Sequence, residues 1–185
     1  MEKFNDFEQD VDFSFWREIC ENHGELRHYS RGEYFAHCGH RLNFCGWITK
    51  GGFKHTLIDD DGNLKTVGFV FKNAVLANYC STLYDRSMPT DIIALEDSDV
   101  LVVPVRLIRQ HIEGNPSLHL HIVRSLFDQA HQTILNGYRY SPYQRYTRLI
   151  ERFPRILRLV SLGEIASYLD ISRRQLHRFR KARTM

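Results

Sequence analysis

The sequence predicts an α+β fold: an N-terminal antiparallel β-roll, a long helix, and two short helices joined by a tight turn. Two observations carry this prediction. From Leu26 to about Val103, short apolar strands alternate with turns at nearly regular spacing, which is typical of antiparallel sandwiches and rolls. After Pro104 the apolar residues recur at helical spacing instead. Strands followed by helices favour an α+β architecture.

The pattern divides the 185 residues into three expected segments. Residues 1–116 form the roll with a helical lead-in, residues 117–140 the dimerisation helix and hinge, and residues 141–185 a C-terminal module. In the lead-in, Phe13, Trp16, Ile19 and Cys20 stand at helical spacing over residues 1–23. The expected strands cover residues 34–35, 44–48, 53–58, 64–71, 92–95 and 100–103.

The helical region begins with an expected short helix over residues 105–112 and a long one over residues 117–137. The apolar stripe of the long helix is too wide for a single contact. It suits a helix packed on the roll along one side and on a second copy of itself along the other. A helix buried within its own chain is the alternative. A further helix opens at Ser141-Pro142 and stops before Pro154, and residues 155–160 form a connector or one short strand.

The stretch from Ser161 to Lys181 has the pattern of two helices around a turn. Ser161 with Glu164, and Ser172 with Gln175, have the spacing of capping boxes. Between them, Asp170 tolerates a left-handed backbone better than most residues. One shared apolar seam is expected from Ile165, Ala166, Leu169, Ile171, Leu176 and Phe179.

The second of these helices has a basic outer face. When Leu176 and Phe179 point inward, Arg174, Arg178 and Lys181 point outward at 100° per residue, with His177 at the flank and Arg173 at the exposed start. A short helix of this kind fits a major groove, so we read it as a DNA-recognition helix. The alternative is a charged face that is merely solvated. The candidate DNA-binding residues are Ser172, Arg173, Arg174, Gln175, His177, Arg178 and Lys181.

Charge is unevenly distributed along the chain. From Tyr138 onward there are 12 Lys and Arg residues against three acidic residues, whereas the remainder has 13 against 19. This segregation indicates that nucleic acid meets only the C-terminal module. The sequence has no apolar run of membrane-spanning length and no secretory signal, so a cytoplasmic protein is expected.

Motifs in both halves of the chain carry a family resemblance. In the roll they are residues 31–35 (RGEYF), Gly51-Gly52 with Asp61-Gly62, and residues 93–100 (IALEDSDV); in the C-terminal module they are residues 145–154 (RYTRLIERFP) and 165–172 (IASYLDIS). These residues resemble the cyclic-AMP receptor/fumarate-nitrate regulator (Crp/Fnr) family of bacterial transcription regulators, in its Bacteroidetes-like form. The resemblance implies a cyclic-nucleotide-binding-like jelly roll and a homodimer, paired through residues 117–138, that binds a palindromic operator on double-stranded DNA. By position, it assigns groove contacts to Ser172, Arg173, Arg174 and Arg178.

The chain departs from this family at the nucleotide cassette. Cyclic-nucleotide binders of the family hold the phosphate with a Gly-Glu pair and, further on, an Arg-Ser pair. Ala77-Asn78 and Met88-Pro89 stand at those positions, and Arg86 lies two residues before the expected arginine. We therefore expect no binding of cyclic AMP; a different small effector, or none, stays open. The family's β-hairpin wing is also expected to be incomplete, because only four residues follow Lys181.

Metal and catalytic chemistry find little support in the sequence. The cysteines Cys20, Cys38, Cys45 and Cys80 form no metal-ligand array, and the run His37-Cys38-Gly39-His40 matches no zinc pattern. We predict no enzyme activity, no cofactor and no metal. A non-DNA-binding sensor or adaptor is the alternative function, and a metal-dependent β-roll enzyme the remote one. RNA polymerase is a further candidate partner.

Overall fold

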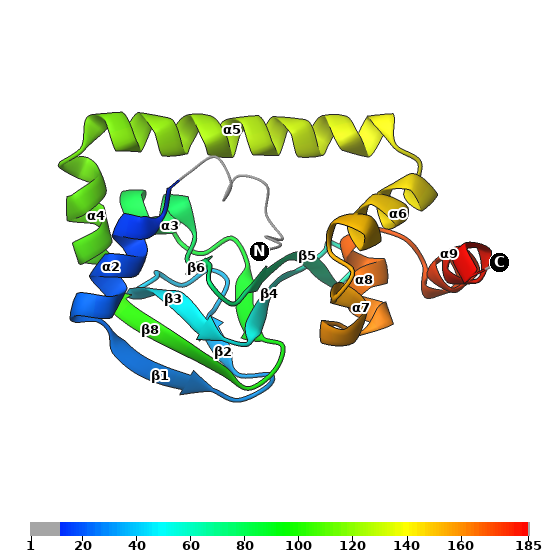
Figure 1. The fold of residues 1–185 in the computed structure, drawn as a ribbon, viewed down its shortest axis with the longest axis horizontal. Coiled ribbons are helices and arrows are strands. Elements are labelled where there is room, and N and C mark those ends of the chain that lie inside the picture. Colours follow the sequence, from blue (N-terminus) through cyan, green and yellow to red (C-terminus); the bar gives the residue numbers. More distant parts are fainter. Residues whose placement is uncertain (1–11, 185) are drawn as a thin grey trace.

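The computed structural model describes residues 12–184. Its N-terminal half contains two four-stranded antiparallel sheets, with strand orders β1-β8-β3-β6 and β2-β7-β4-β5 (Figure 1). The strands are β1 Glu25–Tyr29, β2 Tyr34–Ala36, β3 Phe44–Lys50, β4 Gly52–Ile58, β5 Leu64–Phe71, β6 Val75–Leu76, β7 Asp91–Ala94 and β8 Ser98–Pro104. The expected antiparallel roll is confirmed, with β1 and β6 added to the predicted strands.

The two sheets enclose an apolar core. Ile48, Phe53, Ile92 and Val100 are completely buried between them. These residues alternate with more exposed neighbours along their strands, as the two-residue period of a half-buried strand requires. The roll is therefore held by apolar burial, the main favourable contribution to folding.

Helix α2 (Ser14–His23) covers one end of the roll. Trp16 and Cys20 are buried against the roll core, as their helical spacing predicts. Burial raises the pKa of the Cys20 thiol to about 12, so this group is a neutral core residue. The rest of the predicted lead-in, residues 1–11, lies outside the described residues.

A short helix that the sequence pattern does not predict interrupts the strands. Helix α3 (Tyr79–Tyr84) lies where only strands were expected. Its N-terminus is capped by Asn78, whose side-chain oxygen accepts a hydrogen bond from the Ser81 backbone N–H at 3.0 Å. Asp85 ends it in the left-handed conformation, with φ 53°. Six residues between caps are too few for apolar periodicity to reveal a helix.

Helix α4 (Val105–Glu113) leads into the long helix α5 (Pro116–Arg139), which runs along one side of the molecule (Figure 1). Both helices lie close to their predicted positions. Asn115 caps α5 by accepting a hydrogen bond from the Leu118 N–H at 3.1 Å. Although α5 has 24 residues, Ile122 is its only buried side chain within the described part of the chain.

The remaining helices gather at the far end of α5 (Figure 1). They are α6 (Pro142–Arg152), α7 (Ile156–Leu159), α8 (Leu162–Tyr168) and α9 (Arg173–Thr184). Ser141 and Gln144 form a capping box at α6. The strand considered for residues 155–160 is wrong. One helical turn stands there because it places Ile156 completely in the core of this module, among the side chains of neighbouring helices.

Candidate nucleic-acid interface

Two capped helices, α8 and α9, form the predicted helix-turn-helix. Ser161 Oγ accepts from the Glu164 N–H at 3.2 Å, and the Ser161 N–H donates to Glu164 Oε2 at 2.9 Å. The pair Ser172 and Gln175 repeats this arrangement at the start of α9. Both predicted capping boxes are confirmed, so the first turn of each helix has partners for N–H groups that would otherwise lack them.

The turn between the helices has the predicted backbone. Asp170 adopts the left-handed conformation, with φ 51°. The Ile171 N–H donates to the Ala166 carbonyl oxygen at 2.9 Å, which folds the chain back after α8. The expected apolar seam lies beneath: Ile165, Ala166, Leu169 and Leu176 are buried, and Ile171 and Phe179 are partly buried.

The outer face of α9 is basic and exposed. Arg174, His177, Arg178 and Lys181 all project into solvent, on the side away from buried Leu176. This face is what the helical wheel predicts. Four donor-rich side chains on one exposed helix face can approach phosphate oxygens and base edges together.

Three of the candidate residues, Ser172, Arg173 and Gln175, also have structural contacts. The Arg173 guanidinium lies so close to Gly163 that a Cβ added at Gly163 would stand 2.7 Å from its Nη2 atom. Gln175 Oε1 accepts from the Ser172 N–H at 2.9 Å and from the Ser172 hydroxyl at 3.1 Å. Arg173 thus packs across α8, and the amide oxygen of Gln175 serves the cap.

The acidic residues of the module are largely paired with the roll. Of the three acidic residues after Tyr138, Glu164 lies 2.7 Å from Lys54 Nζ and Asp170 lies 3.2 Å from Lys65 Nζ. Burial raises the pKa of Glu164, but hydrogen bonds from Lys54 and Ser161 outweigh that effect, so its pKa is lowered overall. The roll therefore neutralises two acids that would otherwise oppose the basic field of the C-terminal helices.

The module's apolar core includes residues of the roll. Phe69 of β5 and Leu95, just after β7, are buried in the same cluster as Tyr146, Ile150 and Ile165. The Phe71 and Phe153 rings stack with centroids 5.0 Å apart. Sequence reasoning missed Phe69 and Leu95 as parts of this module. Their only signal in the sequence is that they are apolar residues within or next to a strand.

The residues at the positions of the family's nucleotide cassette have structural roles or lie exposed at the surface. Asn78 caps α3, half-buried Ala77 packs on the roll core, and Met88 is buried within it. Arg86 and Pro89 are exposed. An apolar core residue thus stands where the family resemblance would place the phosphate-binding arginine, and the structure does not bring Arg86 into the core beside it.

The histidine- and cysteine-containing run at residues 37–40 forms an exposed turn. The His37 ring stacks on Tyr34, with centroids 4.3 Å apart, and its Nδ1 lies 3.9 Å from Asp91 Oδ1. Within residues 12–184, no group of three or more His, Cys, Asp or Glu side chains could hold a metal ion. None of the helices described there is long and apolar enough to cross a membrane.

An antiparallel roll followed by a long helix and a helix-turn-helix is the fold of the Crp/Fnr regulators, and this chain has that fold. FixK2 from Bradyrhizobium japonicum matches with a TM-score of 0.71 and 14% identity, over 86% of this chain and 83% of that one. CLP, the c-di-GMP-responsive global regulator of Xanthomonas campestris, matches with a TM-score of 0.67 and 13% identity, over 91% and 90%. The catabolite activator protein of Thermus thermophilus matches with a TM-score of 0.56 and 15% identity, over 91% and 82%. No family model and no curated protein matches the sequence.

Proposed function

We propose that the protein is a DNA-binding transcription regulator of the Crp/Fnr type. The observation that carries this proposal is the exposed basic face of α9, seated on a buried seam between two capped helices. Arg174 and Arg178 are the residues that read or grip DNA. Each can make a bidentate contact to guanine or hold a phosphate oxygen. His177 and Lys181 flank them, and Arg173 and Ser172 lie at the end of α9 that enters the groove.

The regulator acts as a homodimer through α5. The apolar side chains that α5 leaves exposed fall on one face: Leu120, Val123, Phe127, Ile134 and Tyr138. Leu120, Phe127 and Ile134 recur every seven residues, with Val123 and Ala130 between them. This is the a/d pattern by which two helices pack along a shared seam. Ile122, which faces the opposite way, is buried at 1% exposure, so the roll already occupies the other side of the helix.

A dimer of this kind has two recognition helices related by a twofold axis. Such helices enter successive major grooves of a palindromic site about 34 Å apart. A signal received by the roll biases the arrangement of the two C-terminal modules and thereby DNA binding. RNA polymerase is a candidate partner of the DNA-bound dimer.

The roll takes a small effector other than cyclic AMP, or none. The two positions that would hold the cyclic phosphate are occupied by residues with structural roles. Met88 is buried in the roll core, and Asn78 caps α3. CLP, which has a similar fold, is responsive to c-di-GMP, so a regulator of this fold can respond to an effector other than cyclic AMP. The same loss of the cassette favours the alternative function, a sensor or adaptor that keeps the fold without binding DNA.

Selection from a pool of random double-stranded DNA tests the proposal. The full chain should enrich an inverted repeat whose half-sites lie about 10 base pairs apart, centre to centre. Its affinity for that site should fall steeply with salt, because bound lysine and arginine release counterions from phosphate. Enrichment of no sequence, together with salt-independent binding, would favour the adaptor instead.

A further inference from the structure

The β4–β5 hairpin of the roll is fastened to the first helix of the helix-turn-helix. Lys54 on β4 and Glu164 on α8 form an ion pair of 2.7 Å, and their side chains are only 18% and 21% exposed. A half-buried pair is screened less by solvent than a surface pair. Lys54 lies on the outer side of β4, while its neighbour Phe53 points into the roll core. One strand therefore has the roll core on one face and the α8 contact on the other.

The edge of the roll is closed by a residue of α8. Strand β5 lies at the edge of its sheet, where outward-facing N–H groups lack a strand partner. The Thr66 N–H donates to Ser167 Oγ at 2.8 Å, across 101 residues of sequence. Phe69 of β5 packs on Tyr168, with ring centroids 5.3 Å apart. A helix of the C-terminal module thus takes the place of a neighbouring strand.

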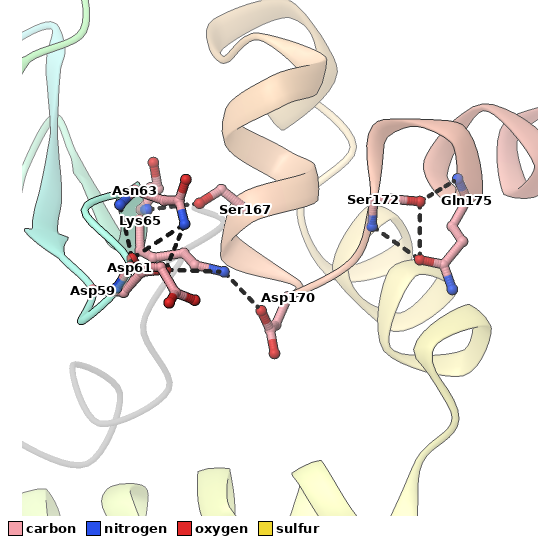
Figure 2. A network of polar contacts seen from close by, with 9 residues as sticks. Asp59, Asp61, Asn63, Lys65, Ser167, Asp170, Ser172 and Gln175 are labelled. Carbon is pink, nitrogen blue, oxygen red and sulfur yellow. Dashed lines mark hydrogen bonds and ion pairs between the residues drawn. The ribbon is translucent and has the colours of Figure 1, made fainter.

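The hairpin also holds the turn between α8 and α9. Figure 2 shows Lys65 reaching from β5 towards Asp170, the left-handed residue of that turn. The hairpin's own turn is closed by Asp59, whose Oδ1 accepts from the Asn63 N–H at 2.7 Å and the Asp61 N–H at 3.1 Å. The second carboxylate oxygen of Asp59, Oδ2, lies 3.9 Å from Lys65 Nζ. The turn that Asp59 closes therefore lies beside Lys65, the residue by which the hairpin contacts the turn between α8 and α9.

We propose that the β4–β5 hairpin is a latch that sets the orientation of α9 for DNA, with Lys54 and Ser167 as its positioning residues. This inference rests on the proposed function. The polar anchors lie on α8 and the turn, at Glu164, Ser167 and Asp170, and none of these lies on the outer face of α9. In the docked arrangement the basic side chains of α9 stay exposed, so this arrangement is the DNA-competent one.

Amide exchange and DNA affinity of the full chain test the latch together. Lys54→Met removes one partner of the ion pair, and Glu164→Gln removes the other while keeping an oxygen for the Ser161 N–H. Each change should speed exchange of the Thr66 amide about tenfold and weaken binding to the selected inverted repeat about tenfold. The slope of affinity against salt should stay the same, because the phosphate contacts are unchanged. Lys54→Arg should restore both properties.

The control is Lys72→Met, which removes an exposed lysine just after β5 and should change neither measurement. Unchanged Thr66 exchange in both Lys54→Met and Glu164→Gln would overturn the latch. Faster exchange with unchanged or tighter DNA binding would overturn its positioning role. If the unsubstituted protein binds no DNA, the proposed function fails, and the exchange comparison still decides whether the latch exists.

Discussion

Ser172 and Gln175 bind each other reciprocally at the start of α9: the Gln175 N–H donates to Ser172 Oγ at 3.1 Å, and the Ser172 N–H donates to Gln175 Oε1 at 2.9 Å (Figure 2). This pair fixes the end of the helix that carries Arg174 and Arg178. The sequence spacing alone predicted it. Because most helices this short are marginal in isolation, the cap decides how well the first turn of α9 is formed.

Ser172→Ala should destabilise the protein by about 1 kcal/mol, the usual loss when a serine N-cap is removed. Gln175→Ala removes only the return bond and should cost less. Because the two side chains act on each other, the double variant should be less destabilised than the sum of the single ones. Urea unfolding of the three variants at one protein concentration measures this coupling. Additive effects would show that the two side chains act independently.

The exposed apolar face of α5 predicts how a charged side chain placed on it would affect dimer formation. Phe127 is 67% exposed and Ile134 is 60% exposed in a single chain, and both would be buried in the proposed dimer. Phe127→Glu or Ile134→Glu should convert the dimer to a monomer, because two carboxylates would face each other in an apolar seam. Sedimentation velocity distinguishes the two states. Gln132→Glu, on the other side of the helix, is the matched control; equal assembly of all three variants would contradict the seam.

The burial of His55 predicts how the free energy of unfolding depends on pH. This residue lies 3.2 Å from Thr90 Oγ1 and opposite Gly68 on β5, and burial lowers its pKa to about 4. An unfolded histidine has a pKa near 6.5, so between these values the unfolded chain binds the extra proton. The stabilisation is complete above about pH 6.5 and is lost as pH falls towards 4. From pH 7 to pH 5 the loss should be about 2 kcal/mol.

His55→Gln should remove most of that pH dependence, because glutamine does not titrate. Urea unfolding at pH 7 and pH 5 provides the measurement, and both values lie above the ordinary pKa values of Asp and Glu, about 3.9 and 4.3. If His55→Gln loses as much stability between the two pH values as the unsubstituted protein, another group is responsible.

The helices and strands that could be predicted from the sequence depend on patterns among residues close together in the chain. The helix caps at Ser141, Ser161 and Ser172 could be predicted because capping depends on residues three apart in the chain. The strands of the roll and the long helix could be predicted from the spacing of their apolar residues. Helix α3 could not be predicted, because its six residues are too few to show a helical period.

Contacts between distant residues could not be predicted in the same way. Thr66 and Ser167 are 101 residues apart, and neither belongs to a pattern that names its partner. Phe69 fits a strand whether its side chain faces solvent or another module. The joining of roll and helix-turn-helix is therefore a tertiary property, whereas the basic face of α9 follows from helical geometry alone.

The binding of the selected inverted repeat by Arg174→Ala and Arg178→Ala variants tests the central proposal most directly. Each substitution should weaken binding by roughly 5- to 150-fold, the range expected when one bidentate base contact is lost. Arg31→Ala, at an exposed arginine of the roll, should leave binding unchanged. If both α9 variants bind the repeat as tightly as the Arg31→Ala control, α9 does not read DNA and the proposed function is wrong.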